Sequence, residues 1–217
     1  MAYLCSMNKA LFAFLIFFTI STHSPAVGVT KKDLAYTNST LELYNACGLT
    51  GEMEYKIFEK AMAGYEKYNH AKSVIAICDF TKPSSRKRFY VIDVEHKKLM
   101  FTSLVAHGKN SGDLMATRFS NTPESLMSSL GFYNVGSQFQ EPKHGLSLVL
   151  NGLESGKNDN ARMRGIIIHG ADYVSEKFVK QYGYAGKSFG CPALPNDVVQ
   201  QVVPVLKDGG LLYICAE

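Results

Sequence analysis

The sequence predicts a domain in which β-strands dominate and helices pack against the sheet. Stretches rich in β-branched and aromatic residues alternate with short polar connections from residue 73 onward, and such side chains pack well on a pleated surface. Three consecutive isoleucines at residues 166–168 repeat this signal late in the chain. The clearest helical periodicity lies upstream, at residues 52–68, where apolar side chains recur on one helical face.

The first 26 residues have the features of a secretory signal peptide. Lys9 precedes an apolar run at residues 10–18, and small residues lead to Ala26. The run is too short to span a bilayer comfortably. We expect cleavage after about Ala26 and an exported protein of the periplasm or cell envelope, which contacts the membrane only through this segment before cleavage. A retained anchor is the alternative.

Composition narrows the class of protein. The 217 residues are 46% hydrophobic and 19% charged, which suits one globular domain. The formal charge falls from +4 to +3 without residues 1–26, because Lys9 is their only charged residue. So mild a charge suits an anionic wall and gives no signal of nucleic-acid binding. No glycine-rich phosphate loop indicates an organic cofactor, so we expect none, and we expect a monomer.

Residues 27–72 are expected to hold a polar linker and two helices that pack on the domain. The linker covers residues 27–38. A short helix at residues 39–46 ends before Gly48, which suits a helix C-cap. The amphipathic helix at residues 52–68 follows.

Strands begin after these helices. Three are predicted at residues 73–80, 88–94 and 99–106. Their short polar connections indicate an antiparallel meander. Residues 119–133 are rich in Ser, Asn, Thr and Pro, which predicts a structured loop with one helical turn near residues 124–128. Long irregular stretches in compact domains are often functional.

The rest of the chain alternates between strands and helices. Strands are predicted at residues 130–139, 145–150, 166–168 and 211–215, and helices at residues 174–182 and 197–207. Residues 153–164 read as a loop. Pro204 should kink or shorten the last helix, because proline removes a helical hydrogen bond.

Candidate chemistry concentrates near the late isoleucine strand. His169 and a glycine end that strand, and Cys191 lies between Gly190 and a proline. A free thiol is only a few per cent thiolate at neutral pH, and a neighbouring imidazole activates it as a nucleophile. This predicts Cys191 as nucleophile, His169 as base, and amides near Gly190 as an oxyanion hole. The alternative is a buried structural cysteine and a hydrogen-bonded histidine.

Histidine followed by glycine occurs three times, at His107, His144 and His169. Each dipeptide begins or follows an apolar run, so each histidine is a candidate base. A zinc site built from these histidines and Cys191 would lack any H-x-x-x-H or C-x-x-C spacing. We therefore expect no metal.

Several stretches occur in an order that matches a known family. They are VAHGKNSG (residues 105–112), FSNTPESLMSSLGFY (119–133), HGLSLVLNGLE (144–154), NDNARMRGIIIHG (158–170) and S-x-G-C-P-A-L (188–194). Together they resemble the L,D-transpeptidase (YkuD-like) family of bacterial cell-wall enzymes, in particular the murein L,D-transpeptidase catalytic domain branch. The resemblance covers roughly residues 74–214. Better-known members carry histidine where this chain has Phe189, and Arg or Asn two residues after the cysteine, where it has Ala193.

The resemblance implies a mainly β fold with peripheral helices, a sandwich or barrel, with the catalytic domain at residues 73–217. It assigns the base to His169 and the nucleophile to Cys191, with Ser188 and Gly190 beside them. The implied reaction is acyl transfer on peptidoglycan peptide stems through a thioester, giving 3→3 cross-links. Alternatives are an L,D-carboxypeptidase and a catalytically inactive wall-binding protein.

Basic residues are the candidates for holding the carboxylates of a peptide stem. Arg164 is the first choice because it adjoins the isoleucine strand, and Arg118 and Lys187 are further candidates. His107 is a candidate substrate contact. Ser188 either bonds the substrate or supports its own loop.

Four cysteines follow the predicted signal peptide: Cys47, Cys78, Cys191 and Cys215. Four cysteines allow three complete pairings. A nucleophilic Cys191 must stay free, which leaves at least one odd thiol. We expect no obligatory disulfide, and we expect Cys78 and Cys215 to be buried thiols in strands.

Overall fold

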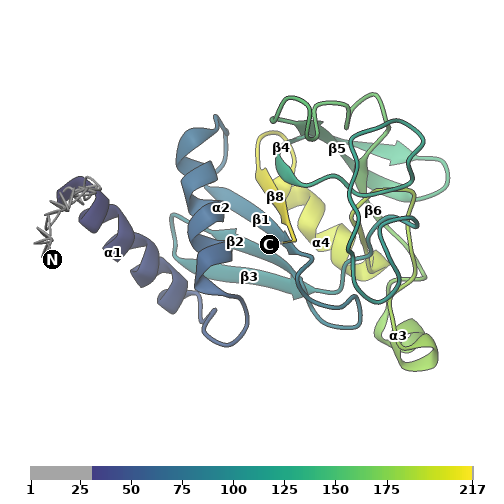
Figure 1. The fold of residues 1–217 in the computed structure, drawn as a ribbon, viewed down its shortest axis with the longest axis horizontal. Coiled ribbons are helices and arrows are strands. Elements are labelled where there is room, and N and C mark those ends of the chain that lie inside the picture. Colours follow the sequence, from purple (N-terminus) through teal and green to yellow (C-terminus); the bar gives the residue numbers. More distant parts are fainter. Residues whose placement is uncertain (1–30, 217) are drawn as a thin grey trace, which may run out of the picture.

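The computed structural model describes residues 31–216 of the chain (Figure 1). The predicted signal peptide, residues 1–26, lies outside the described residues. In chain order the elements are α1 (Lys31–Ala46), α2 (Tyr55–Lys67), β1 (Val74–Asp79), β2 (Phe89–Asp93), β3 (Lys98–Ser103), β4 (Gly131–Glu141), β5 (Gly145–Gly152), β6 (Ile167–Gly170), α3 (Glu176–Tyr182), β7 (Ala193–Leu194), α4 (Asn196–Leu206) and β8 (Leu211–Cys215).

All the strands join one sheet in the order β3-β2-β1-β8-β4-β5-β6-β7. The predicted meander is confirmed, because β1, β2 and β3 pair antiparallel. The C-terminal strand β8 lies at the centre, parallel to β1 and antiparallel to β4. The short strand β7, which sequence periodicity does not predict, pairs in parallel with β6.

The two edges of this sheet meet. Just after β3, the N–H of Ala106 donates to the carbonyl of Ala193 in β7 over 2.9 Å. The sheet thereby closes nearly into a barrel, and the helices lie at its periphery (Figure 1). The predicted fold class, mainly β with peripheral helices, is confirmed.

Strand residues alternate between two apolar clusters, as the period of two in a pleated strand requires. In β1, Ala76 and Cys78 face the cluster that α4 covers, and Ile75 and Ile77 face the cluster that α2 covers. In β8, the residues alternate in the same way. The central strands are therefore buried on both faces, which explains their continuous apolar sequence.

Helix α2 crosses the sheet closely, and α1 extends away from it (Figure 1). The buried face of α2 includes Ile57, Phe58 and Ala61. Gly64 permits close contact with the sheet, since a Cβ there would lie 2.0 Å from the Phe132 ring. The prediction of a linker at residues 27–38 is wrong for residues 31–38, which belong to α1. No proline or glycine interrupts the segment between Lys31 and Ala46.

The predicted helical turn near residues 124–128 is also wrong. Glu124 and Leu126 have φ values of 60° and 56°, which no right-handed helix contains. Carbonyls of this segment instead accept hydrogen bonds from other parts of the chain, such as the Leu126 carbonyl from the Asn110 amide. Within residues 31–216, no helix is both long and apolar enough to cross a membrane.

Candidate active site

Parallel pairing of β6 with β7 brings Cys191 beside the isoleucine strand. The register sets His169 opposite Ala193, so Cys191, two residues earlier, lies opposite Ile167. The Ile167 N–H points to the Cys191 sulfur at 3.5 Å, and the sulfur lies 3.8 Å from the Gly165 carbonyl oxygen. Cys191 is a free thiol with partial solvent exposure. The sulfur is therefore neither paired nor sealed in the core.

One ring nitrogen of His169 is fixed by its neighbour. Nδ1 lies 2.9 Å from the Gly170 carbonyl oxygen. A carbonyl oxygen only accepts hydrogen bonds, so Nδ1 carries the proton and Nε2 is the lone-pair nitrogen. Within residues 31–216, Nε2 has no hydrogen-bond partner. The imidazole is thus oriented with a proton-accepting atom available.

Cys191 and His169 line the same cavity, which has a volume of about 630 Å³. Of the other predicted site residues, Ser188, Arg164 and Lys187 line it as well. The remaining lining residues are Phe139, Glu141, Lys143, His144, Gly165, Ile167, Tyr173 and Phe189. Phe189 is 71% exposed at this site, so its ring is available to a bound molecule.

The loop that carries Cys191 is held by serine hydroxyls. Ser188 Oγ donates to the Cys191 carbonyl at 2.6 Å and accepts from the Gly190 N–H at 3.2 Å. Ser128 Oγ donates to the Gly190 carbonyl at 3.2 Å. These bonds favour a role for Ser188 in supporting its own loop over a role in contacting the substrate.

Gly190 has backbone geometry that only glycine adopts easily. Its φ is +124°, and a Cβ would lie 2.8 Å from the Met127 carbonyl oxygen. Its N–H is already bonded to Ser188. The N–H of Cys191 has no hydrogen-bond acceptor within residues 31–216. An oxyanion at this site would therefore accept a hydrogen bond from the N–H of Cys191 but not from the N–H of Gly190.

Burial sets the protonation of the pair. Burial raises the pKa of Cys191 to about 11, although the Ile167 N–H and the Arg164 charge oppose this rise. Burial also lowers the pKa of His169, and the neighbouring His144 lowers it further. At neutral pH the resting pair is therefore a thiol and a neutral imidazole. A base must remove the thiol proton during attack, because only a small fraction of the sulfur is thiolate beforehand.

Arg164 organises the long loop before β4. Its Nη1 donates to the Ser120 carbonyl at 2.8 Å, and its Nη2 donates to the Met127 carbonyl at 2.6 Å. Its guanidinium also bonds the hydroxyls of Ser125 and Ser129. None of these partners is charged, so the positive charge of Arg164 remains uncompensated near the cavity. This charge favours an anion there.

Two lysines add to the positive charge of the cavity. Lys187 forms an ion pair with Asp113. Lys143 forms no ion pair with any residue that the structure describes. Lys143 therefore offers a freer ammonium group to a ligand than Lys187 does, although the sequence alone did not predict it as a site residue.

Two predicted substrate contacts do not line the cavity. His107 is 0% exposed, and its ring nitrogens face the Arg88 guanidinium at 2.8 Å and the Gly112 carbonyl at 3.2 Å. Arg118 is exposed but not part of the cavity wall. We therefore assign His107 a structural role and leave both residues out of the proposed site.

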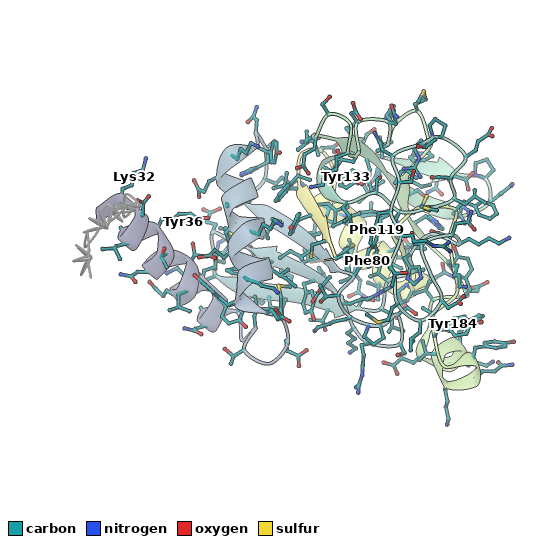
Figure 2. All side chains as sticks on the ribbon, viewed as in Figure 1. Lys32, Tyr36, Phe80, Phe119, Tyr133 and Tyr184 are labelled. Atoms are coloured by element: carbon teal, nitrogen blue, oxygen red, sulfur yellow. The ribbon has the colours of Figure 1, made fainter. Side chains whose placement is uncertain are left out.

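The His107 ring packs against an aromatic pair, Phe80 and Phe119. Phe80 packs edge to face on the His107 ring, with centroids 6.1 Å apart, and stacks on Phe119 with centroids 6.3 Å apart. Phe80 and Phe119 lie close together (Figure 2). Fully buried His107 thus packs on Phe80, which in turn packs on Phe119.

The turn between β4 and β5 contributes more to the cavity than its sequence indicates. Glu141, Lys143 and His144 of that turn all line the cavity. The His144 ring lies against the His169 ring, with centroids 4.0 Å apart. The available signal was the polar turn sequence EPKHG between two predicted strands, but only tertiary structure brings it to His169.

The structure contains a second hollow of about 680 Å³, lined by residues that include Lys82, Arg86, Lys180 and Glu176. It contains neither cysteine nor histidine, so it has no nucleophile and imidazole pair. Across residues 31–216, no three His, Cys, Asp or Glu side chains gather closely enough to hold a metal ion. Cys191 and His169 therefore mark the site where chemistry is best supported.

Comparison with known proteins identifies solved structures of low similarity. An L,D-transpeptidase from Mycobacterium smegmatis is 15% identical with a TM-score of 0.42, and the match covers 66% of this chain and 59% of that one. A variant of the helical cell shape determining protein Pgp2 from Campylobacter jejuni is 19% identical with a TM-score of 0.46, covering 67% and 48%. An L,D-transpeptidase from Stackebrandtia nassauensis is 13% identical with a TM-score of 0.40, covering 81% and 75%.

The chain spans about half to three fifths of the length of the first two of these structures. A search of curated protein sequences found no match. The sequence profile of the L,D-transpeptidase catalytic domain, however, matches residues 49–215, which is well over half of the chain. The protein therefore belongs to the L,D-transpeptidase catalytic domain family.

Proposed function

We propose that this protein transfers acyl groups between peptidoglycan peptide stems through a thioester at Cys191. The observation that carries the proposal is that Cys191, a free thiol, and His169, whose Nε2 has no partner among the described residues, line one cavity. A thiol with a neutral imidazole base is the pair that acyl transfer by cysteine requires. Membership of the family supports peptide stems of peptidoglycan as the substrate.

In the first half-reaction His169 acts as a general base. As the Cys191 sulfur bonds to the carbonyl carbon of the third stem residue, the thiol proton passes to Nε2 of His169. The Cys191 N–H donates to the oxyanion that forms. The carbon–nitrogen bond to the terminal D-alanine then breaks, and the leaving amine takes the proton from the imidazolium. The products are D-alanine, a thioester and neutral His169.

In the second half-reaction the thioester is resolved. A side-chain amine of a neighbouring stem attacks the thioester carbonyl and gives its proton to His169. The carbon–sulfur bond breaks, and the Cys191 sulfur recovers that proton. The new amide is a 3→3 cross-link. Attack by water instead of the amine would release a tripeptide, which is L,D-carboxypeptidase activity.

Positive charge around the cavity supports binding of an acidic stem. Arg164 contributes an uncompensated charge, although its guanidinium hydrogen bonds are committed to the loop before β4. Lys143, which has no ion-pair partner among the described residues, is the better donor to a stem carboxylate. Lys187 would contribute by leaving its exposed partner Asp113.

We also propose that the mature protein is an exported monomer, because its substrate lies outside the cytoplasmic membrane. N-terminal sequencing of the protein recovered from the cell envelope tests the first part, and a start close to Val27 is expected. Retention of residues 1–26 would contradict cleavage. Light scattering of the purified domain tests the second part.

The experiment that tests the reaction is incubation of the purified domain with disaccharide-tetrapeptides, followed by mass spectrometry. A cross-linked dimer that has lost one D-alanine is the expected product. Tripeptide alone would indicate the carboxypeptidase, and unchanged tetrapeptide would indicate a catalytically inactive wall-binding protein.

Two cysteine variants make the assignment of the nucleophile specific. Cys191→Ala should abolish both the reaction and the labelling of the protein by a carbapenem. Cys47→Ala removes a buried thiol outside the cavity and should preserve both. Labelling that persists in Cys191→Ala would remove Cys191 from its proposed role.

A further inference from the structure

The turn between β4 and β5 is built to hold one side chain over the base. The Glu141 carboxylate accepts the N–H groups of Lys143 and His144, both at 2.7 Å. Gly145, with φ +69°, then returns the chain into β5. Burial raises the pKa of Glu141, but these two amide bonds outweigh it and the net pKa is lowered. Glu141 therefore remains a carboxylate and keeps the turn closed.

The turn directs the His144 ring onto the ring of His169. The two centroids are 4.0 Å apart and the planes are tilted by 36°. Within residues 31–216, the ring nitrogens of His144 have no hydrogen-bond partner. Pairing of β5 with β6 sets the distance, because Ser147 is opposite His169 in the sheet. Ring contact is therefore the principal interaction of the His144 side chain.

His169 is thereby held from two directions. The Gly170 carbonyl fixes the Nδ1 edge, and His144 covers one face. The other titratable or charged groups that face the cavity come from three segments: Glu141 and Lys143 from the turn, Lys187 and Cys191 from the nucleophile loop, and Arg164 and Tyr173 from the chain on either side of β6. Among these groups, His144 alone is in ring contact with His169.

The His144 ring influences the protonation of His169. Its electrostatic interaction with the adjacent ring lowers the pKa of His169. The His144 ring also displaces water from one face of His169, and a dry imidazole disfavours the charged form. Both effects keep His169 able to accept a proton at mildly acidic pH.

We propose that His144 is a positioning residue that packs on His169, keeps it neutral and sets the lower pH limit of acyl transfer. The proposal rests on the proposed function only in its last clause. The contact between the two rings and its effect on the protonation of His169 are independent of which reaction the cavity supports.

The first test measures protonation directly and needs no activity. The His169 ring is titrated by NMR in the wild type, in His144→Phe and in His144→Ala. His144→Ala should move the titration of His169 upward by about 0.5 in pH or more, because it removes both the covering ring and its electrostatic interaction with His169. His144→Phe keeps a covering ring without that interaction, so the titration of His169 in this variant should fall between the other two.

His96→Ala is the matched control, because His96 is an exposed histidine paired with Asp93 and outside the cavity. It should leave the titration of His169 unchanged. An unchanged titration in both His144 variants, with circular dichroism showing that they are folded, would overturn the proposal. If His144→Ala does not fold, the comparison of His144→Phe with the wild type decides, and no upward movement there would count against the proposal.

The second test measures the pH profile of kcat/KM with disaccharide-tetrapeptides. The acidic limb should move upward in His144→Ala by the same amount as the NMR titration, with less than a tenfold loss of rate at the optimum. An active His144→Ala with an unmoved limb would refute His144 as the residue that sets the pH limit, while the proposed function would stand. If even the wild type were inactive, the proposed function would fail, and the NMR titration would still decide whether the rings are coupled.

Discussion

Two of the His-Gly dipeptides lie on either side of strand β7, yet they differ in chemistry. We call them the first corner, at His107, and the second corner, at His169. His107 follows β3 and is 0% exposed, and His169 lies in β6 and is 2% exposed. Both ring nitrogens of His107 have partners, in Arg88 and Gly112. His169 has a partner only on Nδ1 among the residues that the structure describes. An imidazole with both nitrogens engaged accepts a proton less readily, so the second corner is the better candidate for a base.

The first corner supports the loop of the second. The Ser188 N–H donates to the His107 carbonyl at 3.0 Å, and the Lys109 N–H donates to the Ser188 carbonyl at 2.7 Å. Ser188 in turn holds the Cys191 carbonyl. Buried Arg88 fixes His107 from the other side. The His107 corner is thus a structural support, whereas the His169 corner holds the proposed base, so variants at the two corners should fail in different ways.

The largest expected effect separates activity from stability. His169→Gln should lower kcat/KM by about 10²- to 10⁴-fold, because the general base is lost, with little change in the melting temperature. His107→Gln should lower the free energy of unfolding by about 1–3 kcal/mol, because buried hydrogen bonds are lost. Its kcat/KM should stay within about tenfold of the wild type.

Disaccharide-tetrapeptide turnover and thermal unfolding, measured on the same preparations, check this pair. A folded His107→Gln protein that loses as much rate as His169→Gln would erase the distinction between the two corners.

A second effect concerns the resting state of Cys191. Since its pKa is raised to about 11, only a small fraction of the sulfur is thiolate at pH 7. Alkylation by iodoacetamide, which needs the thiolate, should therefore accelerate about 100-fold between pH 7 and pH 9. Cys191→Ser supplies the background rate. A rate that levels off below pH 8 would instead indicate a thiolate formed in advance with an imidazolium.

The third effect is a pH dependence of stability that originates at His107. Burial first, and the Arg88 charge second, lower the pKa of His107 from 6.5 to about 4. Between these values the unfolded chain binds a proton that the folded protein does not, so stability falls as the pH drops from 6.5 to 4. The loss from this group should reach about 3 kcal/mol and then remain constant at lower pH.

Urea unfolding at several pH values measures this loss. His107→Gln, which has no group titrating there, should show a correspondingly smaller change between pH 6.5 and 4. Equal pH dependence in the two proteins would mean that other groups cause it.

The smallest expected effect concerns Ser188, whose N–H bonds the His107 carbonyl and whose hydroxyl bonds the Cys191 carbonyl. Ser188→Ala removes the bond to the Cys191 carbonyl and leaves the Gly190 N–H without its acceptor. We expect a loss of about 1 kcal/mol in stability and roughly tenfold in kcat/KM. Ser188→Thr keeps the hydroxyl and should restore most of both. Failure of the threonine variant to recover activity, despite a recovered melting temperature, would argue that Ser188 also contacts the substrate.

Sequence reasoning predicted the regular elements well and the irregular ones less well. Strand β8 was predicted with the boundaries Leu211–Cys215 that the structure has, because its apolar run is flanked by glycines on one side. The helical turn near residues 124–128 was wrong, because bonds from distant Asn110 and Arg164 decide the backbone there. Strand β7 has two residues, too few to show a period.

The residues of the candidate site also differ in whether the sequence indicated their role. Cys191 and His169 were recognisable as chemical groups and from the resemblance to a family. Lys143 was not recognised, and His144 was recognised only as one of three candidate bases, because nothing near them in the chain indicates that their neighbour is β6. Arg164 was predicted as a carboxylate binder and does line the cavity, but the sequence did not indicate that its guanidinium also bonds the carbonyls of the loop before β4.

The sequence by itself determined which segments are strands and helices, which thiol lies on a constrained bend, and which family the chain resembles. These depend on side chains within a few positions of one another, whose periodicity and backbone preferences act locally. Tertiary structure alone decided that His107 has partners on both ring nitrogens, that His169 has one on Nδ1 only among the described residues, and which turn covers His169. Those outcomes depend on pairings across the sheet, where burial and hydrogen bonding join residues far apart in the chain.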